Sequence, residues 1–195
     1  MEGYNRYDKY KKARNTAWNA LINGGIRELP VNLKNVAEAY GIAVYSYKTA
    51  IKNGLIESEE AVGAGFSKII DERKYIFVSN AKSSSEVRFD IACQIGHFAL
   101  GHKIYGKPVK SKKFGRNDYE AYIFARDLLM PAAVLYGMGI HSAEKIEELC
   151  GVTHDLAEKR AERMEELYIR KKFNTHPSEI KVNEQFEKFI NAYSI

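Results

Sequence analysis

Cys93, Gln94 and His97 lie in the middle of an apolar stretch, Val87–His102, which reads V-R-F-D-I-A-C-Q-I-G-H-F-A-L-G-H. Polar atoms in a buried segment cost free energy unless they have partners, so these side chains need a reason to be there. Positions 93 and 97 are i and i+4 on a helix, and their side chains can converge on one point. This is the spacing of the two histidines in a helical H-E-x-x-H zinc site, with cysteine in place of the first histidine and glutamine in place of the glutamate.

The composition is that of one globular unit. The chain has 195 residues, of which 45% are hydrophobic and 28% charged, and no apolar run approaches the length of a membrane span. The first residues lack the apolar stretch of a signal peptide, so we expect a cytoplasmic protein with no membrane partner. The two cysteines, Cys93 and Cys150, form no disulfide framework and are expected to be thiols.

The basic character of the chain is spread along its length. The net charge is +5, and the densest cluster, Lys107–Lys113, is expected to be a solvated loop. This spread argues against direct binding to nucleic acid, although the helix-turn-helix-like rhythm of Leu33–Tyr45 keeps it as an alternative.

The hydrophobic pattern predicts an α+β fold with a small antiparallel sheet packed on one central helix. The predicted strands are Ile42–Tyr47, Ala64–Ile70 and Lys74–Ser79. A capping box, Ser83-x-x-Glu86, opens the central helix, and Asn117-x-x-Glu120 opens the next, which Pro131 ends. The other predicted helices are Tyr4–Asn23, a short one between Asn32 and Gly41, Ser142–Cys150, Thr153–Lys172 and Ser178–Tyr193. We divide the chain into an N-terminal helix (residues 1–28), a core (29–140) and a helical C-terminal region (141–195).

Two motifs in this order carry a resemblance. The first is R-F-D-I-A-C-Q-I-G-H-F-A-L-G-H, and the second is E-A-Y-I-F-A-R-D-L-L-M-P. Together they resemble the ImmA/IrrE family of metallopeptidases, whose motifs run close to R-F-x-x-A-H-E-x-G-H-x-x-x-G-H and E-A-N-x-F-A-x-E-L-L-M-P. The resemblance extends over roughly Leu29–Leu167.

The resemblance implies a zincin-like minimal metallopeptidase core. It implies a zinc ion held by two histidines and a glutamate, with the motif glutamate as general base. Carried over by position, the metal ligands are Cys93, His97 and Glu120, and Gln94 takes the place of the base. Family members act on helix-turn-helix repressors of mobile elements or stress regulons.

Both departures weaken hydrolysis. A carboxamide at Gln94 cannot take a proton from water, and general-base catalysis is worth about 10²–10⁴-fold. Sulfur at Cys93 lies closer to its helix than an imidazole nitrogen would, so zinc is expected to be weakly held or absent. We therefore expect a non-catalytic or impaired relative that binds a helix-turn-helix regulator. The alternative is an active zinc endopeptidase that uses Cys93, His97 and Glu120 as ligands.

Plainer roles compete at each position. Cys93 can be a small buried hydrophobe, Glu120 the third residue of a capping box with Asn117, and Gln94 a hydrogen-bond partner of His97 or the backbone. His102 is expected to cap the helix or to border the cleft. Outside this set, Asp127 can support a ligand or be a surface carboxylate. A Cys93–His97 nucleophilic pair oriented by Glu120 is a further alternative, but nothing in the sequence supplies an oxyanion site.

Overall fold

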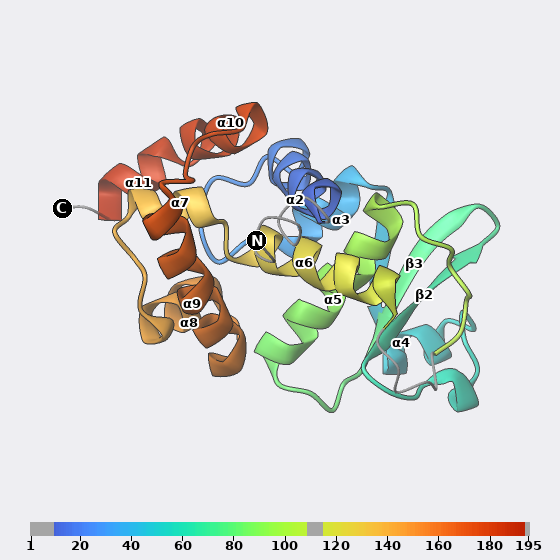
Figure 1. Ribbon diagram of the computed structural model, residues 1–195. Coiled ribbons are helices and arrows are strands. Elements are labelled where there is room, and N and C mark those ends of the chain that lie inside the picture. Colours follow the sequence, from blue (N-terminus) through green and yellow to red (C-terminus); the bar gives the residue numbers. More distant parts are fainter. Residues whose placement is uncertain (1–9, 109–114, 194–195) are drawn as a thin grey trace.

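The computed structural model describes residues 10–108 and 115–193. A three-stranded sheet lies at one end of the molecule and the C-terminal helices lie at the other (Figure 1). Helices α5 (Ser84–Ala99) and α6 (Arg116–Leu129) lie between them. The predicted start of the N-terminal helix and most of the lysine cluster at 107–113 fall outside the described residues. The α+β class is confirmed.

The sheet is mixed, with the order β1-β3-β2, so the antiparallel sheet expected from the sequence is wrong in one pairing. Strands β2 (Gly65–Ile70) and β3 (Arg73–Val78) form an antiparallel hairpin, whereas β1 (Ile42–Ser46) runs parallel to β3. A parallel neighbour needs a crossover, and here the chain passes through α4 (Tyr47–Lys52) and η1 (Ser58–Glu60) before it enters the hairpin. The turn of the hairpin reverses the chain, so β3 runs opposite to β2 and in the same direction as β1.

The central helix, α5 (Ser84–Ala99), forms as the capping box predicts. Ser83 Oγ accepts the backbone N–H of Glu86, and the Glu86 carboxylate accepts the backbone N–H of Ser83 at 3.1 Å. The helix contacts β2 and β3 on one side and α6 on the other. It ends at Ala99, one turn earlier than the predicted end at His102.

Helix α6 (Arg116–Leu129) crosses α5 at the glycine of the first motif. A Cβ atom at Gly96 would lie 2.8 Å from Cδ1 of Phe124, so this glycine permits the close approach of an aromatic ring. The predicted capping box of Asn117 and Glu120 is wrong, because the N-cap is Gly115, two residues earlier. Asp118 accepts the backbone N–H of Gly115 at 2.8 Å instead.

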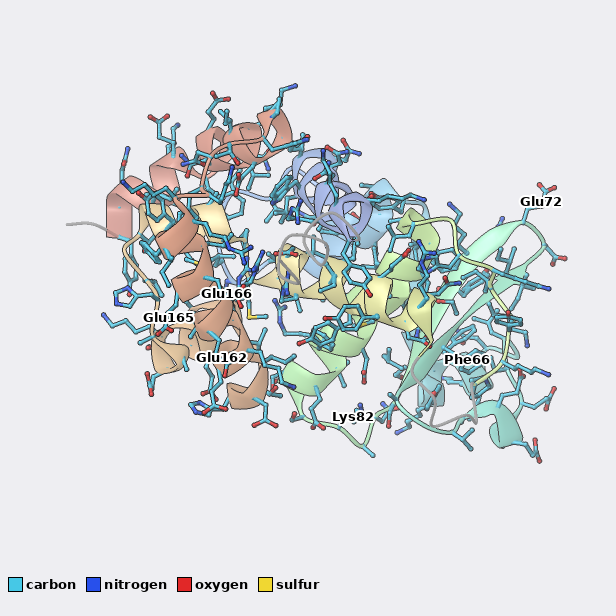
Figure 2. The ribbon with its side chains drawn as sticks, in the orientation of Figure 1. Phe66, Glu72, Lys82, Glu162, Glu165 and Glu166 are labelled. Carbon is cyan, nitrogen blue, oxygen red and sulfur yellow. The ribbon has the colours of Figure 1, made fainter. Side chains whose placement is uncertain are left out.

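The remaining helices enclose the main core, and a second, smaller cluster consists of Tyr47, Ala50, Ile56, Phe66 and Phe77. They are α2 (Lys11–Asn23), α3 (Leu33–Ala39), α7 (Ala132–Gly137), α8 (Ala143–Cys150), α9 (His154–Arg170), α10 (Pro177–Gln185) and α11 (Glu187–Tyr193). The last predicted helix, Ser178–Tyr193, is therefore two helices. They are separated at Phe186, whose side chain is completely buried. In Figure 2, Glu162, Glu165 and Glu166 mark α9, and Glu72 marks the hairpin tip at the opposite end. Along the described ranges, the chain forms no helix with the length and apolar character of a membrane span.

Candidate functional site

The end of α5 places His102 against His97. Gly101 has φ 73° and donates its N–H to the carbonyl of Phe98 at 3.1 Å, while the N–H of His102 donates to the carbonyl of His97 at 2.9 Å. These two bonds make a Schellman motif, in which a glycine with positive φ closes the helix and folds the next residue back over its last turn. The G-H pair that closes the first motif is therefore a positioning device for the second histidine.

His97, His102 and Glu120 form one hydrogen-bonded chain. The Nδ1 atoms of the two histidines are 3.1 Å apart, and Nε2 of His102 is 3.3 Å from Oε2 of Glu120. The other carboxylate oxygen of Glu120 accepts from Nε of Arg116 at 2.9 Å. The side chains of His102 and Glu120 are only 8% and 14% exposed. The two motif helices thus meet at these residues, and the sequence-predicted ligand positions His97 and Glu120 are joined through His102.

The electrostatics favour an ionised carboxylate and a neutral imidazole in this chain. Burial lowers the pKa of His97 and the neighbouring His102 lowers it further, although Asp118 opposes both. For Glu120, burial acts to raise the pKa, but the hydrogen bonds from Arg116 and His102 outweigh it and the pKa is lowered. If His102 donates through Nε2 to this carboxylate, its Nδ1 accepts from His97. In that tautomer the lone pair of His97 is on Nε2, which lies 3.8 Å from a carboxylate oxygen of Asp118.

Gln94 is held by the sheet. Oγ of Ser67, on β2, donates to Oε1 of Gln94 at 2.6 Å, and Ser67 is 6% exposed. The side-chain carbonyl oxygen of Gln94 is therefore bonded to Ser67 and takes no part in the hydrogen bond between the two histidines. A carboxamide has no basic atom with which to accept a proton from water.

Cys93 is half-buried and packs against the main core. Burial raises the pKa of its thiol, and Asp90 and Asp118 raise it further, so the group is a neutral thiol at pH 7. The thiolate, not the thiol, is the nucleophile and the metal ligand. These features argue against a Cys93–His97 nucleophilic pair.

The residues as they lie do not fit a zinc ion. In the part of the chain that the structure describes, no three His, Cys, Asp or Glu side chains are grouped so that they could hold a metal. Two imidazoles and a carboxylate are suitable zinc donors, but here the two rings are hydrogen-bonded to each other through Nδ1, with centroids 5.1 Å apart and planes at 70°. The thiol at the first ligand position is protonated.

The sequence did not reveal the role of Asp127. It is 3% exposed and accepts from Nη2 of Arg126 at 2.8 Å and from Nη1 of Arg160 at 2.9 Å. It is therefore neither a surface carboxylate nor a partner of the His97 chain. The signal was absent because Arg160 lies 33 positions away on α9, within a helix whose pattern of charges is typical of an exposed surface.

Comparison with known proteins gives one match. The family model described as the IrrE N-terminal-like domain, Peptidase M78, matches residues 37–162, which include the sheet, both motif helices and the first half of α9. Comparisons with curated proteins and with solved structures gave no match. The matched region covers more than half of the chain and contains Cys93, Gln94, His97 and Glu120. The chain therefore belongs to the IrrE N-terminal-like family, Peptidase M78.

Proposed function

We propose that this chain is a non-catalytic or impaired member of its family that binds a helix-turn-helix regulator as a protein partner without cutting it. The observation that carries the proposal is the hydrogen bond from Ser67 to Gln94 at the position of the family's general base. Gln94 cannot act as a base, but its side chain is hydrogen-bonded to the sheet, which is a structural role. Loss of the base alone corresponds to about 10²–10⁴-fold in rate.

One further feature supports this function. The thiol of Cys93 is neutral because burial raises its pKa, so it lacks the charge of a metal ligand at pH 7. Together with Gln94, this neutral thiol leaves the site without a charged donor at position 93 and without a carboxylate base at position 94.

The second candidate is a zinc-dependent endopeptidase. The contact between His102 and Glu120 favours it, because imidazole and carboxylate donors from both motifs already lie within 3.3 Å of each other. A zinc ion held by rearranged side chains would act as a Lewis acid toward a carbonyl oxygen or bound water. This chain would still have to supply a proton acceptor other than Gln94.

Zinc titration of four proteins separates the candidates: the parent, Cys93→His, Gln94→Glu and the double variant. We expect the parent to bind zinc weakly and the double variant to bind at least tenfold more tightly, which is about 1.4 kcal/mol. Tight stoichiometric zinc in the parent that disappears in His97→Ala would favour the peptidase. A folded double variant that gains no affinity would refute the idea of a degraded metal site.

Partner binding needs a second measurement. The chain is mixed with a panel of helix-turn-helix regulators, and complexes are followed by size-exclusion chromatography and intact mass. We expect a complex in which the regulator keeps its full mass. Fragments that form without chelator and not with it would overturn the non-catalytic assignment, and the absence of any complex would overturn the partner class.

A further inference from the structure

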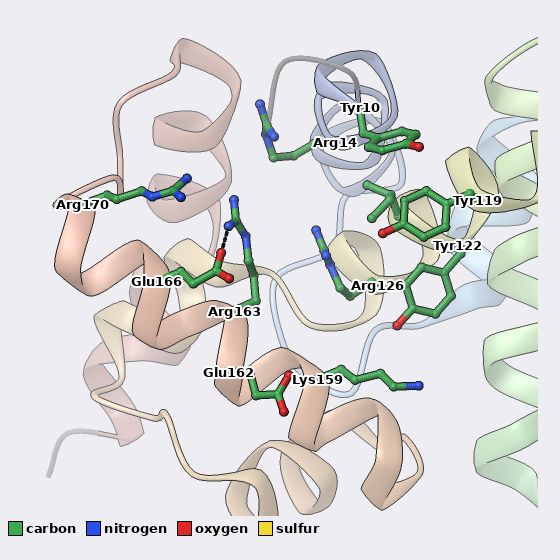
Figure 3. Close-up of a pocket in the computed structure, with 11 residues that line it drawn as sticks. Tyr10, Arg14, Tyr119, Tyr122, Arg126, Lys159, Glu162, Arg163, Glu166 and Arg170 are labelled. Atoms are coloured by element: carbon green, nitrogen blue, oxygen red, sulfur yellow. Dashed lines mark hydrogen bonds and ion pairs between the residues drawn. The ribbon is translucent and has the colours of Figure 1, made fainter. Parts of the chain in front are cut away.

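A polar cavity lies between α2, α6 and α9, away from the histidine chain (Figure 3). Its volume is about 340 Å³, at the small end of the 300–1,000 Å³ found for small-molecule sites. Its polar lining consists of tyrosines, basic residues and two carboxylates: Tyr10, Tyr119, Tyr122, Arg14, Arg126, Lys159, Arg163, Arg170, Glu162 and Glu166.

The cavity is rich in cations, and four of its five basic side chains are arginines. Arginine offers planar pairs of N–H donors that match the oxygens of phosphate or carboxylate, so this choice of residue indicates recognition of an oxyanion. The lining holds five basic side chains and two carboxylates, Glu162 and Glu166; Arg163 is paired with Glu166, and Arg126 with Asp127 behind the wall. Lys159 and Arg170 add positive charge at its edges (Figure 3).

A buried arginine lies behind the wall of the cavity. A small neighbouring pocket of about 20 Å³, enough for one water molecule, shares Arg14, Arg126 and Arg163 with the main cavity and is also lined by Arg160, Asp127 and Glu179. Arg160 is 1% exposed. Its Nε and Nη2 atoms, and Nε of Arg126, are buried without a hydrogen-bond partner among the described residues.

These N–H groups stay unpartnered although two carboxylates line the small pocket: Asp127 accepts from other atoms of Arg126 and Arg160, and Glu179 accepts the backbone N–H of Thr175. Buried N–H groups normally have an acceptor, and each exception calls for a missing one. Burial lowers the pKa of Arg160 to about 10, with Asp127 acting against the shift and the charge of Arg126 adding to it. Asp127 already bridges the two guanidinium groups, so what an additional acceptor would satisfy is the set of unpartnered N–H groups.

The tyrosines complete the lining with further donors. Tyr119 and Tyr122, one turn apart on α6, have ring centroids 5.8 Å apart and stacked planes, and Tyr10 packs on Tyr119 at 4.7 Å. Figure 3 shows the hydroxyl groups of Tyr119 and Tyr122 on the side of their rings that faces Arg126. The aromatic side therefore presents hydroxyl donors toward the same space as the guanidinium groups.

We propose that this cavity binds the phosphate group of a small phosphorylated molecule the size of a mononucleotide. A phosphate monoester offers three terminal oxygens and close to two negative charges, which suits a lining of several arginines and tyrosine hydroxyls better than a single carboxylate does. The remaining volume accommodates the organic part of the ligand beside Tyr119 and Tyr122. The site is independent of zinc and of the residue at position 94.

Binding is tested by thermal unfolding and calorimetry of the full chain after exhaustive removal of phosphate. The probes are inorganic phosphate, AMP, adenosine and citrate, at matched ionic strength. We expect AMP at about 100 times its Kd to raise Tm by roughly 5–10 °C, and adenosine to have no effect. Phosphate without any advantage for AMP would restrict the ligand to the free ion and overturn the size assignment.

Substitutions locate the site. Arg163→Gln and Arg170→Gln should each weaken AMP binding at least tenfold, whereas Arg73→Gln, which removes the same charge from the exposed hairpin, should leave it unchanged. Lys159→Gln is a second cavity variant on the exposed face of α9, in case loss of the Arg163–Glu166 pair impairs folding.

Three outcomes would overturn the proposal. They are no response to any phosphate compound, equal weakening by Arg73→Gln, and citrate binding as tightly as AMP. Binding of a phosphopeptide but not of AMP would assign the cavity to a protein partner and would also refute a small-molecule site.

Discussion

Replacing Gly96 with alanine tests whether the crossing of α5 and α6 depends on the absence of a side chain. The new Cβ would lie 2.8 Å from Cδ1, 3.2 Å from Cγ and 3.3 Å from Cβ of Phe124, all closer than ordinary van der Waals contact. Phe124 is completely buried and cannot turn away into solvent. The two helices must therefore separate, or the ring must leave its preferred position.

The expected loss of stability follows from two opposing terms. Overpacking a close-packed core costs about 1–3 kcal/mol, and the contact of three atoms places this site in the upper half of that range. Alanine in place of glycine within a helix returns about 1 kcal/mol. We expect a net loss of about 1–2 kcal/mol in the free energy of unfolding, or roughly 2–8 °C in Tm.

Urea unfolding followed by circular dichroism measures this loss, with the m-value checked for a change in the unfolded state. The matched variants are Phe124→Leu and the double substitution with Gly96→Ala. The smaller side chain makes room for the methyl group, so the double variant should be more stable than the sum of the two single losses predicts, by about 0.5 kcal/mol or more. A Gly96→Ala protein that is more stable than the parent would refute the packing argument.

Three other predictions concern stability and reactivity. Asp127→Asn should cost about 3–5 kcal/mol in urea unfolding, because it leaves two buried guanidinium groups without their shared carboxylate, whereas the exposed control Glu165→Gln should stay within about 0.5 kcal/mol. Arg126 and Arg160 lower the pKa of Asp127 against the effect of burial, so its contribution is complete above the unfolded pKa of about 3.9 and is lost as the pH falls below it. Asp127→Asn should therefore flatten the acid limb of stability against pH, and an unchanged limb would contradict the assignment. Ser83→Ala should cost about 1 kcal/mol through loss of the α5 cap, measured in the same assay, and no loss would show that the capping bond contributes nothing. Burial raises the pKa of Cys150 to about 12, so in a Cys93→Ser background its thiol should resist a thiol reagent at pH 8 until the protein is unfolded, and prompt labelling of the folded protein would contradict this.

Local signals in the sequence predicted the central helix well. The capping box at Ser83 and the spacing of Cys93 and His97 are properties of a few adjacent residues, and the structure contains the helix that they imply. Gly101 also carried a usable signal, because glycine after a helix predicts the Schellman end that turns His102 back onto His97.

Features that depend on distant contacts were not predictable in this way. Strand composition does not encode strand order, so the insertion of β3 between β1 and β2 had no local signature. The Asp127–Arg160 pair joins positions 33 residues apart, and the charged pattern of α9 concealed the one arginine that is buried. The cavity beside Tyr119 likewise arises only when α2, α6 and α9 come together.

The contact between Gly96 and Phe124 also bears on whether this fold needs a metal. The helices that carry His97 and Glu120 are joined by a glycine–phenylalanine contact and an aliphatic core, whereas a structural zinc domain relies on its metal to fold. A change of side chain at a ligand position would therefore leave such a scaffold folded. Cysteine and glutamine at positions 93 and 94 are compatible with a stable protein for this reason.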